Sequence, residues 1–276
     1  MQCAACGGAT ENIGEKFEVS LHHCVRCGSV SADCQEPQAA FYEETYFDGG
    51  AYGYAQGAVA TTNQSALDSA SRRRLAFLKG PQQVVELGAG AGSFVRAGMN
   101  AGINILGVER SAHMREIAQR EHGVRLYADV PELHEGPLAI VLVEVIEHIK
   151  RPRDFLTDVC TSAGRMPDRL LLTTPNGDAV QLLGIGWNQV KPPEHLLLYT
   201  ADGLRALLES FGYKRIKFHY YHSAWLDWSI KRFGSRSNRR VPVLWCFSSL
   251  LRYFDSFCCY VLPKRCSMGM ECYCVR

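Results

Sequence analysis

A glycine-rich turn between a short apolar run and a helix-like segment constrains this chain more than any other feature. Residues 84–87 read as a buried strand, and Gly88, Gly90 and Gly92 follow before a predicted helix that runs to about residue 101. Glycines at such a turn let the backbone approach a ligand at the amino end of a helix. The sequence therefore predicts an open α/β sheet with a ligand at the carboxyl ends of its strands.

Strand-like and helix-like segments alternate after this turn, which is typical of a parallel sheet with helices on both faces. The composition permits a large core, since 47% of the residues are hydrophobic and 21% are charged. Together with 84–87, the further predicted strands make a seven-stranded, Rossmann-like sheet. They lie at 103–109, 124–127, 138–143, 169–173 and 215–221, and the last lies at 268–275, where the residues alternate.

The acid that ends the second predicted strand narrows the choice of ligand. Glu109 lies about twenty residues after the turn, where a carboxylate can accept hydrogen bonds from both hydroxyls of a ribose. The dinucleotide-binding fingerprint requires Gly or Ala at position 93, but Ser93 stands there. Instead, Glu86 precedes three glycines at alternate positions. This pattern resembles motif I of class I S-adenosylmethionine-dependent methyltransferases.

The resemblance extends over residues 80–222 and the last predicted strand, and it implies bound S-adenosylmethionine. Tyr127-Ala128-Asp129 resembles the segment whose Asp holds the adenine amino group, while Glu109 takes the ribose. The chain is accordingly expected to be an enzyme that transfers methyl groups. The residues expected to bind the cofactor are Glu86, Gly88, Ala89, Gly90, Gly92, Glu109, Arg110, Asp129 and Glu144.

A cluster of acids and histidines is expected beside this cofactor. Glu144, Glu147 and His148 follow the fourth predicted strand at positions i, i+3 and i+4, which puts their side chains on one side of a helical turn. His195 lies beyond the fifth strand, near the same edge of the sheet. Similar clusters occur in the ubiquinone-pathway catechol O-methyltransferases and in the small-RNA 3′-terminal ribose methyltransferases, which use a metal ion.

Two chemical roles are open for this cluster. Two carboxylates and two imidazoles could hold Mg²⁺ or Mn²⁺ with positions left for substrate hydroxyls. Alternatively, a histidine is the general base and the glutamates orient it, with a rate that rises through an apparent pKa near the usual value of about 6.5. The predicted catalytic residues are His148, His195 and Glu147, with His148 as the base because a strand fixes its backbone.

Two Cys-x-x-Cys pairs, each followed by glycine, open the sequence: Cys3 with Cys6, and Cys24 with Cys27. Residues 16–21 alternate like one strand of a hairpin that would bring the pairs together. Four thiolates in this pattern resemble a zinc ribbon, and they would leave no open position on Zn²⁺, so the ion would be structural. The alternative is two unrelated cysteine pairs in a flexible terminus.

These features divide the chain into three predicted parts. Residues 1–36 form the ribbon, 37–79 an aromatic linker or lid with a lead-in helix, and 80–276 the methyltransferase domain. A helical insertion is expected at 223–266. Its basic start and apolar continuation could form a lid, or could touch an anionic membrane through residues 231–263.

Charge and chain features bear on the acceptor and the compartment. The net charge is only +2 and the ribbon has few basic residues, which argues against nucleic acid. No secretory signal or spanning segment is recognisable, so a cytoplasmic protein is predicted, with peripheral contact at the inner membrane face as a variant. The expected function is O-methylation of a small molecule or sugar in a biosynthetic pathway. The alternatives are an RNA-modifying methyltransferase whose ribbon grips nucleic acid, and a non-catalytic methyltransferase-like scaffold.

Overall fold

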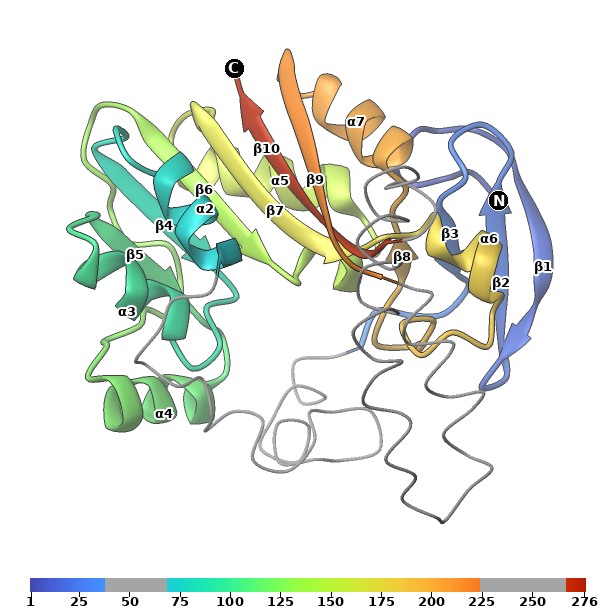
Figure 1. The fold of residues 1–276 in the computed structure, drawn as a ribbon, viewed down its shortest axis with the longest axis horizontal. Helices are drawn as coiled ribbons and strands as arrows, with labels where there is room; N and C mark the ends of the chain where they lie inside the picture. The colour runs from blue at the N-terminus through green and yellow to red at the C-terminus, as the bar shows by residue number, and fades with distance from the viewer. Residues whose placement is uncertain (38–68, 224–266) are drawn as a thin grey trace, which may run out of the picture.

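The computed structural model describes residues 1–37, 69–223 and 267–276, and its centre is a six-stranded mixed sheet (Figure 1). Four strands run parallel, and the last strand in the sequence is antiparallel to both of its neighbours. This confirms the predicted α/β sheet. The order across it is β5 (Ile105–Val108), β4 (Gln83–Leu87), β6 (Leu138–Val143), β7 (Arg169–Pro175), β10 (Ser267–Val275) and β9 (Arg215–Ser223).

Different helices cover the two faces of the sheet, because successive side chains of a strand point to opposite sides. The even-numbered residues of β6 lie in one buried cluster with residues of α5 (Pro152–Ser162) and α7 (Ala201–Glu209). Its odd-numbered residues pack in a second cluster with residues of α3 (Ser93–Asn100) and α4 (Ala112–His122). The continuous apolar sequence of β6 thus reflects burial on both faces.

Several helices begin or end where the sequence supplies a cap. The hydroxyl of Ser111 accepts a hydrogen bond from the Met114 amide at 3.3 Å, which starts α4, and Gly123 ends this helix in the left-handed conformation. Pro152 occupies the first position of α5, where its missing N–H costs no hydrogen bond. These local signals explain why the helices lie where the sequence pattern expects them.

The predicted third strand, at 124–127, is reduced to one parallel bridge, so the prediction of a seventh strand is wrong. Tyr127 alone pairs, donating its amide to the Gly107 carbonyl and accepting from Glu109. The neighbouring strand β5 ends at Val108, so the edge segment meets only its last residues. Val124 and Leu126 are still buried, as their apolar character requires.

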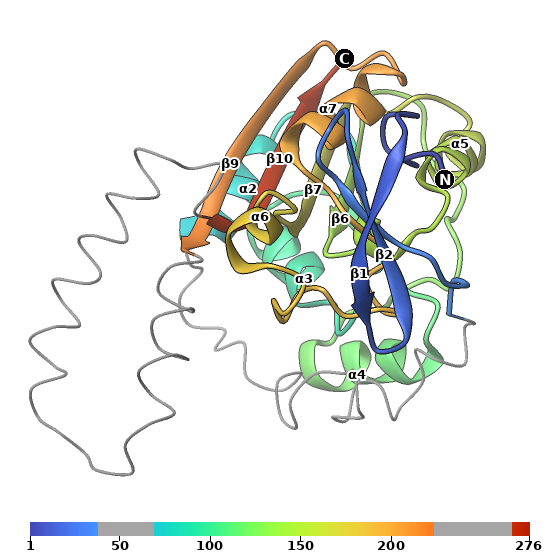
Figure 2. The same cartoon turned by 90° about the vertical axis from the view of Figure 1, so that its right-hand side faces the viewer.

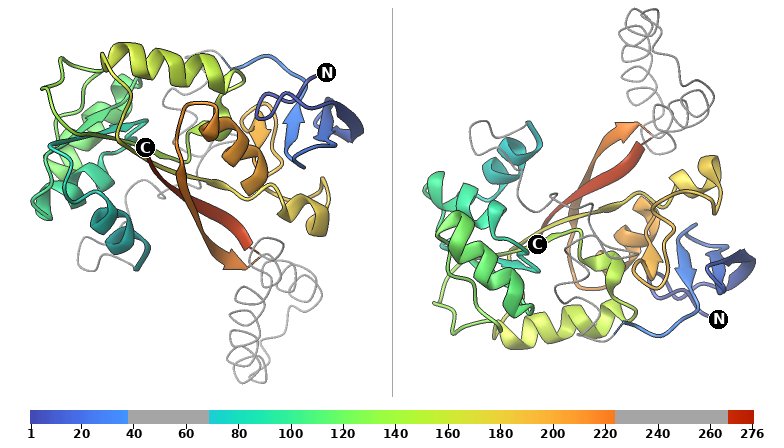
Figure 3. Two further views of the ribbon diagram at one scale, coloured as in Figure 1. Left: turned by 90° about the horizontal axis from the view of Figure 1, so that it is seen from above. Right: turned by 90° about the horizontal axis from the view of Figure 1, so that it is seen from below.

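The N-terminal residues form a second, antiparallel sheet at the opposite end of the molecule from α3 and α4 (Figures 1 and 3). A hairpin turn at Phe17 and Glu18, which both adopt positive φ angles, interrupts the predicted single strand at 16–21, so that only residues 19–21 lie in one strand. Figure 2 looks onto this hairpin. The order of strands is β1 (Thr10–Lys16), β2 (Val19–Cys24), β3 (Val30–Ala32) and β8 (Leu197–Leu198). The fourth strand therefore comes from the large domain.

Two predicted segments lie wholly or largely outside the described residues. The helical insertion at 223–266 is one of them, and the aromatic part of 37–79 is the other. Of the lead-in region, the structure describes α2 (Ser69–Phe77), which packs through Phe77 on the second buried cluster. Within the described ranges, no helix has the length and apolar character needed to cross a membrane.

Candidate functional site

The glycine-rich turn joins β4 to α3 with a geometry that only glycine suits at two positions. Gly88 has a φ of 72°, and a Cβ atom there would lie 2.7 Å from Cγ2 of Val145. Gly92 caps α3 in the left-handed conformation, with a φ of 76°. The turn therefore exposes backbone at the carboxyl end of β4, as the sequence predicts for a cofactor site.

Glu109 lies directly beside this turn. One carboxylate oxygen accepts the Gly90 amide and the other accepts the Ser111 amide, both at 2.9 Å. Two backbone donors hold the carboxylate in one orientation, and a carboxylate keeps lone pairs for further donors. The residue thus fits the predicted role of accepting hydrogen bonds from a ribose.

Glu86, the acid before the first glycine, is only 3% exposed. Burial raises the pKa of its carboxyl to about 8, against the opposing charge of Arg74. Among the described residues its Oε2 atom has no hydrogen-bond partner. A buried carboxyl oxygen without a partner fits a polar ligand in the turn, which is the second observation in favour of S-adenosylmethionine here.

Two other predicted cofactor residues, Arg110 and Asp129, are both exposed. Asp129 follows the one-residue bridge at Tyr127, which brings it to the carboxyl side of β5. Their assignment to cofactor binding stays a prediction.

Three of the four predicted cluster residues converge at the ends of β6 and β7. A nitrogen of His148, a nitrogen of His195 and an oxygen of Glu147 all lie within 4.8 Å of one another. The two imidazole rings meet edge to face, with centroids 4.9 Å apart. Glu147 and His148 belong to the 3-10 turn η2 (Ile146–His148), while His195 precedes β8.

Backbone carbonyls set the tautomers of both histidines. His148 Nδ1 lies 2.9 Å from the Glu194 carbonyl oxygen, and His195 Nδ1 lies 2.8 Å from that of Gln189. A carbonyl only accepts, so in the neutral rings each Nδ1 carries the proton and each Nε2 carries the lone pair. Burial lowers the pKa of His148 to about 4 and holds that of His195 well below its usual value.

Glu147 is completely buried. Burial first, and then the neighbouring carboxylate of Glu144, raise the pKa of Glu147 well above its usual value. Neither of its oxygens has a hydrogen-bond partner of good geometry among the residues that the structure describes. The site therefore combines two neutral imidazoles with a buried carboxyl group that retains bonding capacity.

Glu144 departs from the predicted arrangement. It has a φ of 54°, so the chain leaves β6 through a left-handed residue rather than through a helical turn. Its Oε1 accepts the Thr173 hydroxyl at 2.7 Å and the Tyr221 hydroxyl at 3.1 Å. Glu144 thus stands next to the cluster, bound to residues of β7 and β9 that sequence reasoning missed. Its predicted contact with the cofactor stays a prediction.

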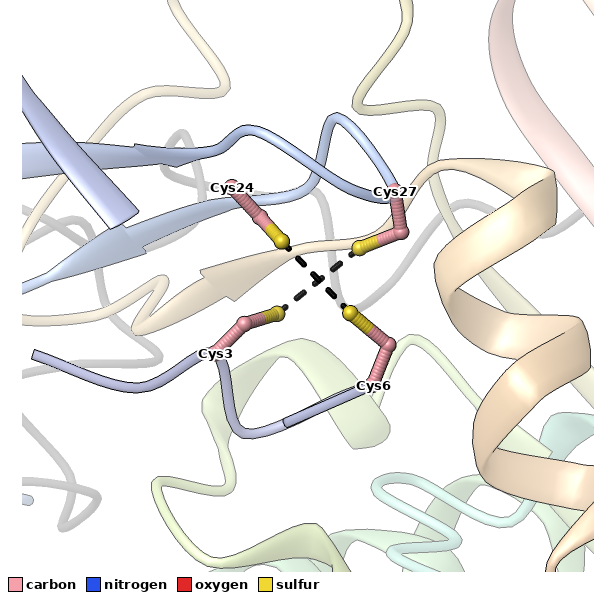
Figure 4. A group of neighbouring side chains, drawn as sticks. All are labelled: Cys3, Cys6, Cys24 and Cys27. Carbon is pink, nitrogen blue, oxygen red and sulfur yellow. Dashed lines mark hydrogen bonds between the residues drawn. The ribbon is translucent and has the colours of Figure 1, made fainter. Parts of the chain in front are cut away.

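The four N-terminal thiols form a separate cluster at the base of the ribbon (Figure 4). Cys3 Sγ lies 3.7 Å from Cys27 Sγ, and Cys6 Sγ lies 3.5 Å from Cys24 Sγ, as two crossed pairs. The glycines after each pair, Gly7 and Gly28, have positive φ angles that close the turns. Four converging sulfur atoms fit the tetrahedral ligand set that zinc takes in structural sites.

Comparison with known proteins agrees with this geometry. A family model described as a methyltransferase domain matches residues 60–217, which is more than half of the chain. No curated protein matches the sequence significantly. Among solved structures, a SAM-dependent methyltransferase from Archaeoglobus fulgidus is 17% identical, with a TM-score of 0.50 over 74% of this chain and 90% of that chain.

Two further solved structures have lower TM-scores. The methyltransferase domain of a bacterial CtHen1 is 15% identical, with a TM-score of 0.48 over 75% of this chain and 96% of that chain. Magnesium protoporphyrin IX methyltransferase from Synechocystis PCC 6803 is 14% identical, with a TM-score of 0.46 over 75% and 82%. The likeness to the archaeal enzyme shows the Rossmann-like methyltransferase fold. From the family match, the fold and the cofactor turn together, the chain belongs to the methyltransferase domain family as a class I S-adenosylmethionine-dependent methyltransferase.

Proposed function

We propose that this enzyme methylates an oxygen atom of a small molecule or sugar, with His148 as the general base. The observation that carries the proposal is the contact of His148 Nδ1 with the Glu194 carbonyl at 2.9 Å, near the carboxyl ends of β6 and β7. Because a carbonyl only accepts, this contact assigns the proton to Nδ1 and leaves Nε2 as the nitrogen that would take the acceptor's proton. S-adenosylmethionine supplies an already activated methyl group, so the protein must position the acceptor and remove its proton. The motifs that resemble the ubiquinone-pathway O-methyltransferases support oxygen as the acceptor atom.

Accessibility favours His148 over the other members of the cluster. Its side chain is 17% exposed, whereas that of His195 is 5% exposed and that of Glu147 is not exposed at all. An acceptor can therefore approach His148 first. Its Nε2 lies 4.0 Å from Oε1 of Glu147, so this buried carboxyl group is a polar neighbour of the nitrogen that would take the proton.

A metal-assisted variant of the same reaction has its own supporting observation. The three donor atoms converge within 4.8 Å, and each Nδ1 bonds a carbonyl, as metal-bound histidines commonly do. A divalent cation held by Glu147, His148 and His195 would lower the pKa of an acceptor hydroxyl as a Lewis acid. The two imidazoles are softer donors than Mg²⁺ prefers, which favours the base over Mg²⁺ in this site.

One experiment separates these variants while allowing for zinc in the ribbon. The enzyme is stripped with EDTA and then supplied with one equivalent of Zn²⁺, with or without Mg²⁺ or Mn²⁺. If His148 is the base, Zn²⁺ alone restores the rate and His148→Ala lowers it about 10²–10⁴-fold. His134→Ala is the control, since that exposed histidine lies outside the cluster. Dependence on Mg²⁺ or Mn²⁺, with Glu147→Gln as damaging as His148→Ala, supports the metal instead.

The pH dependence gives a second reading of the same proposal. The base must be neutral, and the pKa of His148 is lowered to about 4 rather than standing near 6.5 as the sequence suggests. The rate should therefore stay constant from neutral pH down to about 5 and fall as the pH drops through 4. Single-turnover rates measured across this range test the expectation. A rate that still rises between pH 6 and 8 would contradict His148 as the base.

The choice of acceptor rests partly on the ribbon. Residues 1–34 contain two basic side chains, Lys16 and Arg26. Lys16 Nζ donates to the Trp187 carbonyl at 2.7 Å, and the exposed Arg26 lies with Nη1 3.5 Å from the Cys6 carbonyl. This supports a small molecule or glycan over RNA, because nucleic-acid binding needs cations that reach phosphates. Methylation of RNA by the purified enzyme would favour the alternative. Cytoplasmic location, and membrane contact through residues 231–263, stay proposals.

For the four-cysteine cluster we propose one structural Zn²⁺ per chain. The support is the convergence of four thiols with the crossed geometry of Figure 4, and the two turns closed by Gly7 and Gly28. The four thiols would fill the coordination sphere of the ion, so this zinc would not bind the acceptor.

A further inference from the structure

The ribbon and the segment that carries His195 are joined edge to edge. β3 pairs with β8 in antiparallel fashion, and the Ala32 amide donates to the Leu196 carbonyl at 2.9 Å. On the other side of the same residue, the Leu196 amide donates to the Glu147 carbonyl at 2.8 Å. The residue next to His195 is therefore held between the ribbon and the turn that bears Glu147.

A second connection runs from the cysteine cluster itself to the start of α7. Ser29 Oγ lies 3.4 Å from Cys27 Sγ and accepts the Thr200 amide at 3.2 Å. The Thr200 hydroxyl donates to the Cys27 carbonyl and accepts the Gly203 amide at 3.0 Å. Ser29 and Thr200 are each 1% exposed, and a Cβ on Gly203 would lie 2.1 Å from Ser29 Oγ. The cysteine cluster and the start of α7 are therefore joined by direct contacts between buried protein atoms.

The ribbon also holds the chain that follows the catalytic turn. Lys150 Nζ donates to the Cys34 carbonyl at 2.6 Å, and Arg153 Nη2 donates to the Ala5 carbonyl at 3.0 Å. Both cations lie within five residues of His148. Thus the ribbon contacts both segments that carry Glu147, His148 and His195. The glycine turn of the cofactor site instead leads into α3, at the far end of the molecule (Figures 1 and 3).

We propose that the ribbon positions the catalytic cluster, with Ser29 and Thr200 as its positioning residues, so that occupancy of the cysteine site sets the rate of methyl transfer but not the affinity for S-adenosylmethionine. This rests on the proposed zinc and on the proposed role of the histidines. A metal ion bound by Cys24 and Cys27 would fix the turn between them and, with it, the position of Ser29. Through the pairing of β3 and the hydrogen bond to Thr200, it would also fix the backbone on both sides of β8. Small displacements of a catalytic group cost large factors in rate.

Two variants test the link without removing a cysteine or a catalytic side chain. Ser29→Ala and Thr200→Val each delete one hydroxyl of the connection, and Thr200→Ser restores the second. We expect both deletions to keep one zinc per chain, to leave the Kd for S-adenosylhomocysteine within about twofold, and to lower kcat about tenfold or more. Thr200→Ser should recover most of the rate. Thr161→Val on α5 is the matched control, because its hydroxyl bonds only within that helix.

A spectroscopic readout separates positioning from general stability. Long-range ¹H–¹⁵N spectra of the imidazoles should show the Nδ1-protonated tautomer of His195 in the zinc form, and a shifted or broadened signal in the chelated protein and in Ser29→Ala. Restoring one equivalent of Zn²⁺ should restore both signal and kcat. An unchanged His195 signal and kcat in these forms would overturn the proposal, and so would a parallel loss of cofactor affinity. If His148→Ala retains activity, His148 is not the general base. The tautomer signal of His195 would still report on the ribbon in that case, so the two proposals fail separately.

Discussion

Individual side chains in the cofactor site owe their orientation to backbone donors rather than to other side chains. Glu109 is the clearest case, since its two oxygens are held by the amides of Gly90 and Ser111. The first amide belongs to the glycine turn and the second to the residue that caps α4. The carboxylate is therefore set in place before any ligand binds, which limits the entropy lost on binding.

Removing this carboxylate should weaken binding of the cofactor product. Calorimetry with S-adenosylhomocysteine should give an affinity at least tenfold lower for Glu109→Ala, because lost hydrogen bonds to a charged group cost about 1.5–3 kcal/mol. Glu116→Ala, an exposed acid on α4, is the control and should leave the affinity unchanged. Equal affinities for Glu109→Ala and the native protein would reject the ribose assignment.

At the scale of single residues, the sequence motifs predicted most of the side chains that lie around the candidate site, but not the position of Glu144. The glycines, Glu109 and the convergence of Glu147, His148 and His195 follow from motifs whose members are close in sequence or end adjacent strands. Glu144 was expected on the same helical turn, but a single left-handed residue turns it toward β7 and β9. No spacing rule anticipates one positive φ at a non-glycine residue.

At the scale of secondary-structure elements, a buried ionic network joins α2 to β10, and no sequence pattern predicts it. Glu271 lies in the middle of β10 and is not exposed at all. It accepts Arg73 Nη2 and Arg74 Nε of α2, each at 2.8 Å, and the Tyr273 hydroxyl. Its two arginine partners are almost 200 residues away along the chain, so no local pattern links them to Glu271. This network fastens α2 to the antiparallel strand β10.

Neutralising Glu271 should loosen that attachment. Glu271→Gln leaves two guanidinium groups without their counter-charge, and removing one member of a buried ion pair costs about 3–5 kcal/mol. Because both arginines keep some exposure to water, we expect a loss of about 3 kcal/mol in urea unfolding. Glu121→Gln, which breaks an exposed pair with Arg120, should cost less than about 1 kcal/mol. Equal losses in the two variants would contradict the network's role.

Element boundaries were predictable where capping residues mark them, and unpredictable at edges. Ser111 and Gly123 bound α4 as their types suggest. The segment 124–127 has strand-like alternation, but an edge position beside a four-residue strand reduces it to one bridge. Likewise, nothing in the pair Phe17 and Glu18 signals a tight turn, because left-handed backbone is normally supplied by glycine or asparagine.

Across the whole molecule, the ribbon is part of the main hydrophobic core. Cys3, Ala5, Cys24 and Cys27 belong to the same buried cluster as Leu204 and Leu207 of α7. Composition and spacing suggest a separate small unit ending near residue 36. The hydrogen bonds that bind it to the rest come from residues between 116 and 173 positions later, which no local pattern reveals. The sequence thus predicts the two cysteine pairs, but not the surface on which they rest.

Loss of the cysteine site should therefore affect the entire fold. We expect the double variant Cys3→Ser with Cys24→Ser to lose its zinc and to lower the Tm of the main calorimetric transition by roughly 10 °C, since 1 kcal/mol shifts the Tm of such a chain by about 2–4 °C. Cys34→Ser, which changes a thiol outside the cluster, should keep both the zinc and the Tm. A zinc-free double variant that melts at the native temperature would mean that the ribbon folds independently.

The origin of strand β8 has a consequence for how the chain is made. β3 pairs with a strand that begins at Leu197, so the ribbon sheet stays one strand short until roughly 170 more residues have been synthesised. At about 5–20 residues per second, that interval lasts roughly ten to thirty seconds. During translation the four thiols and the edge of β3 therefore remain without β8 while the chain is still on the ribosome. An ion bound early would hold the nascent hairpin in the conformation that pairs with β8.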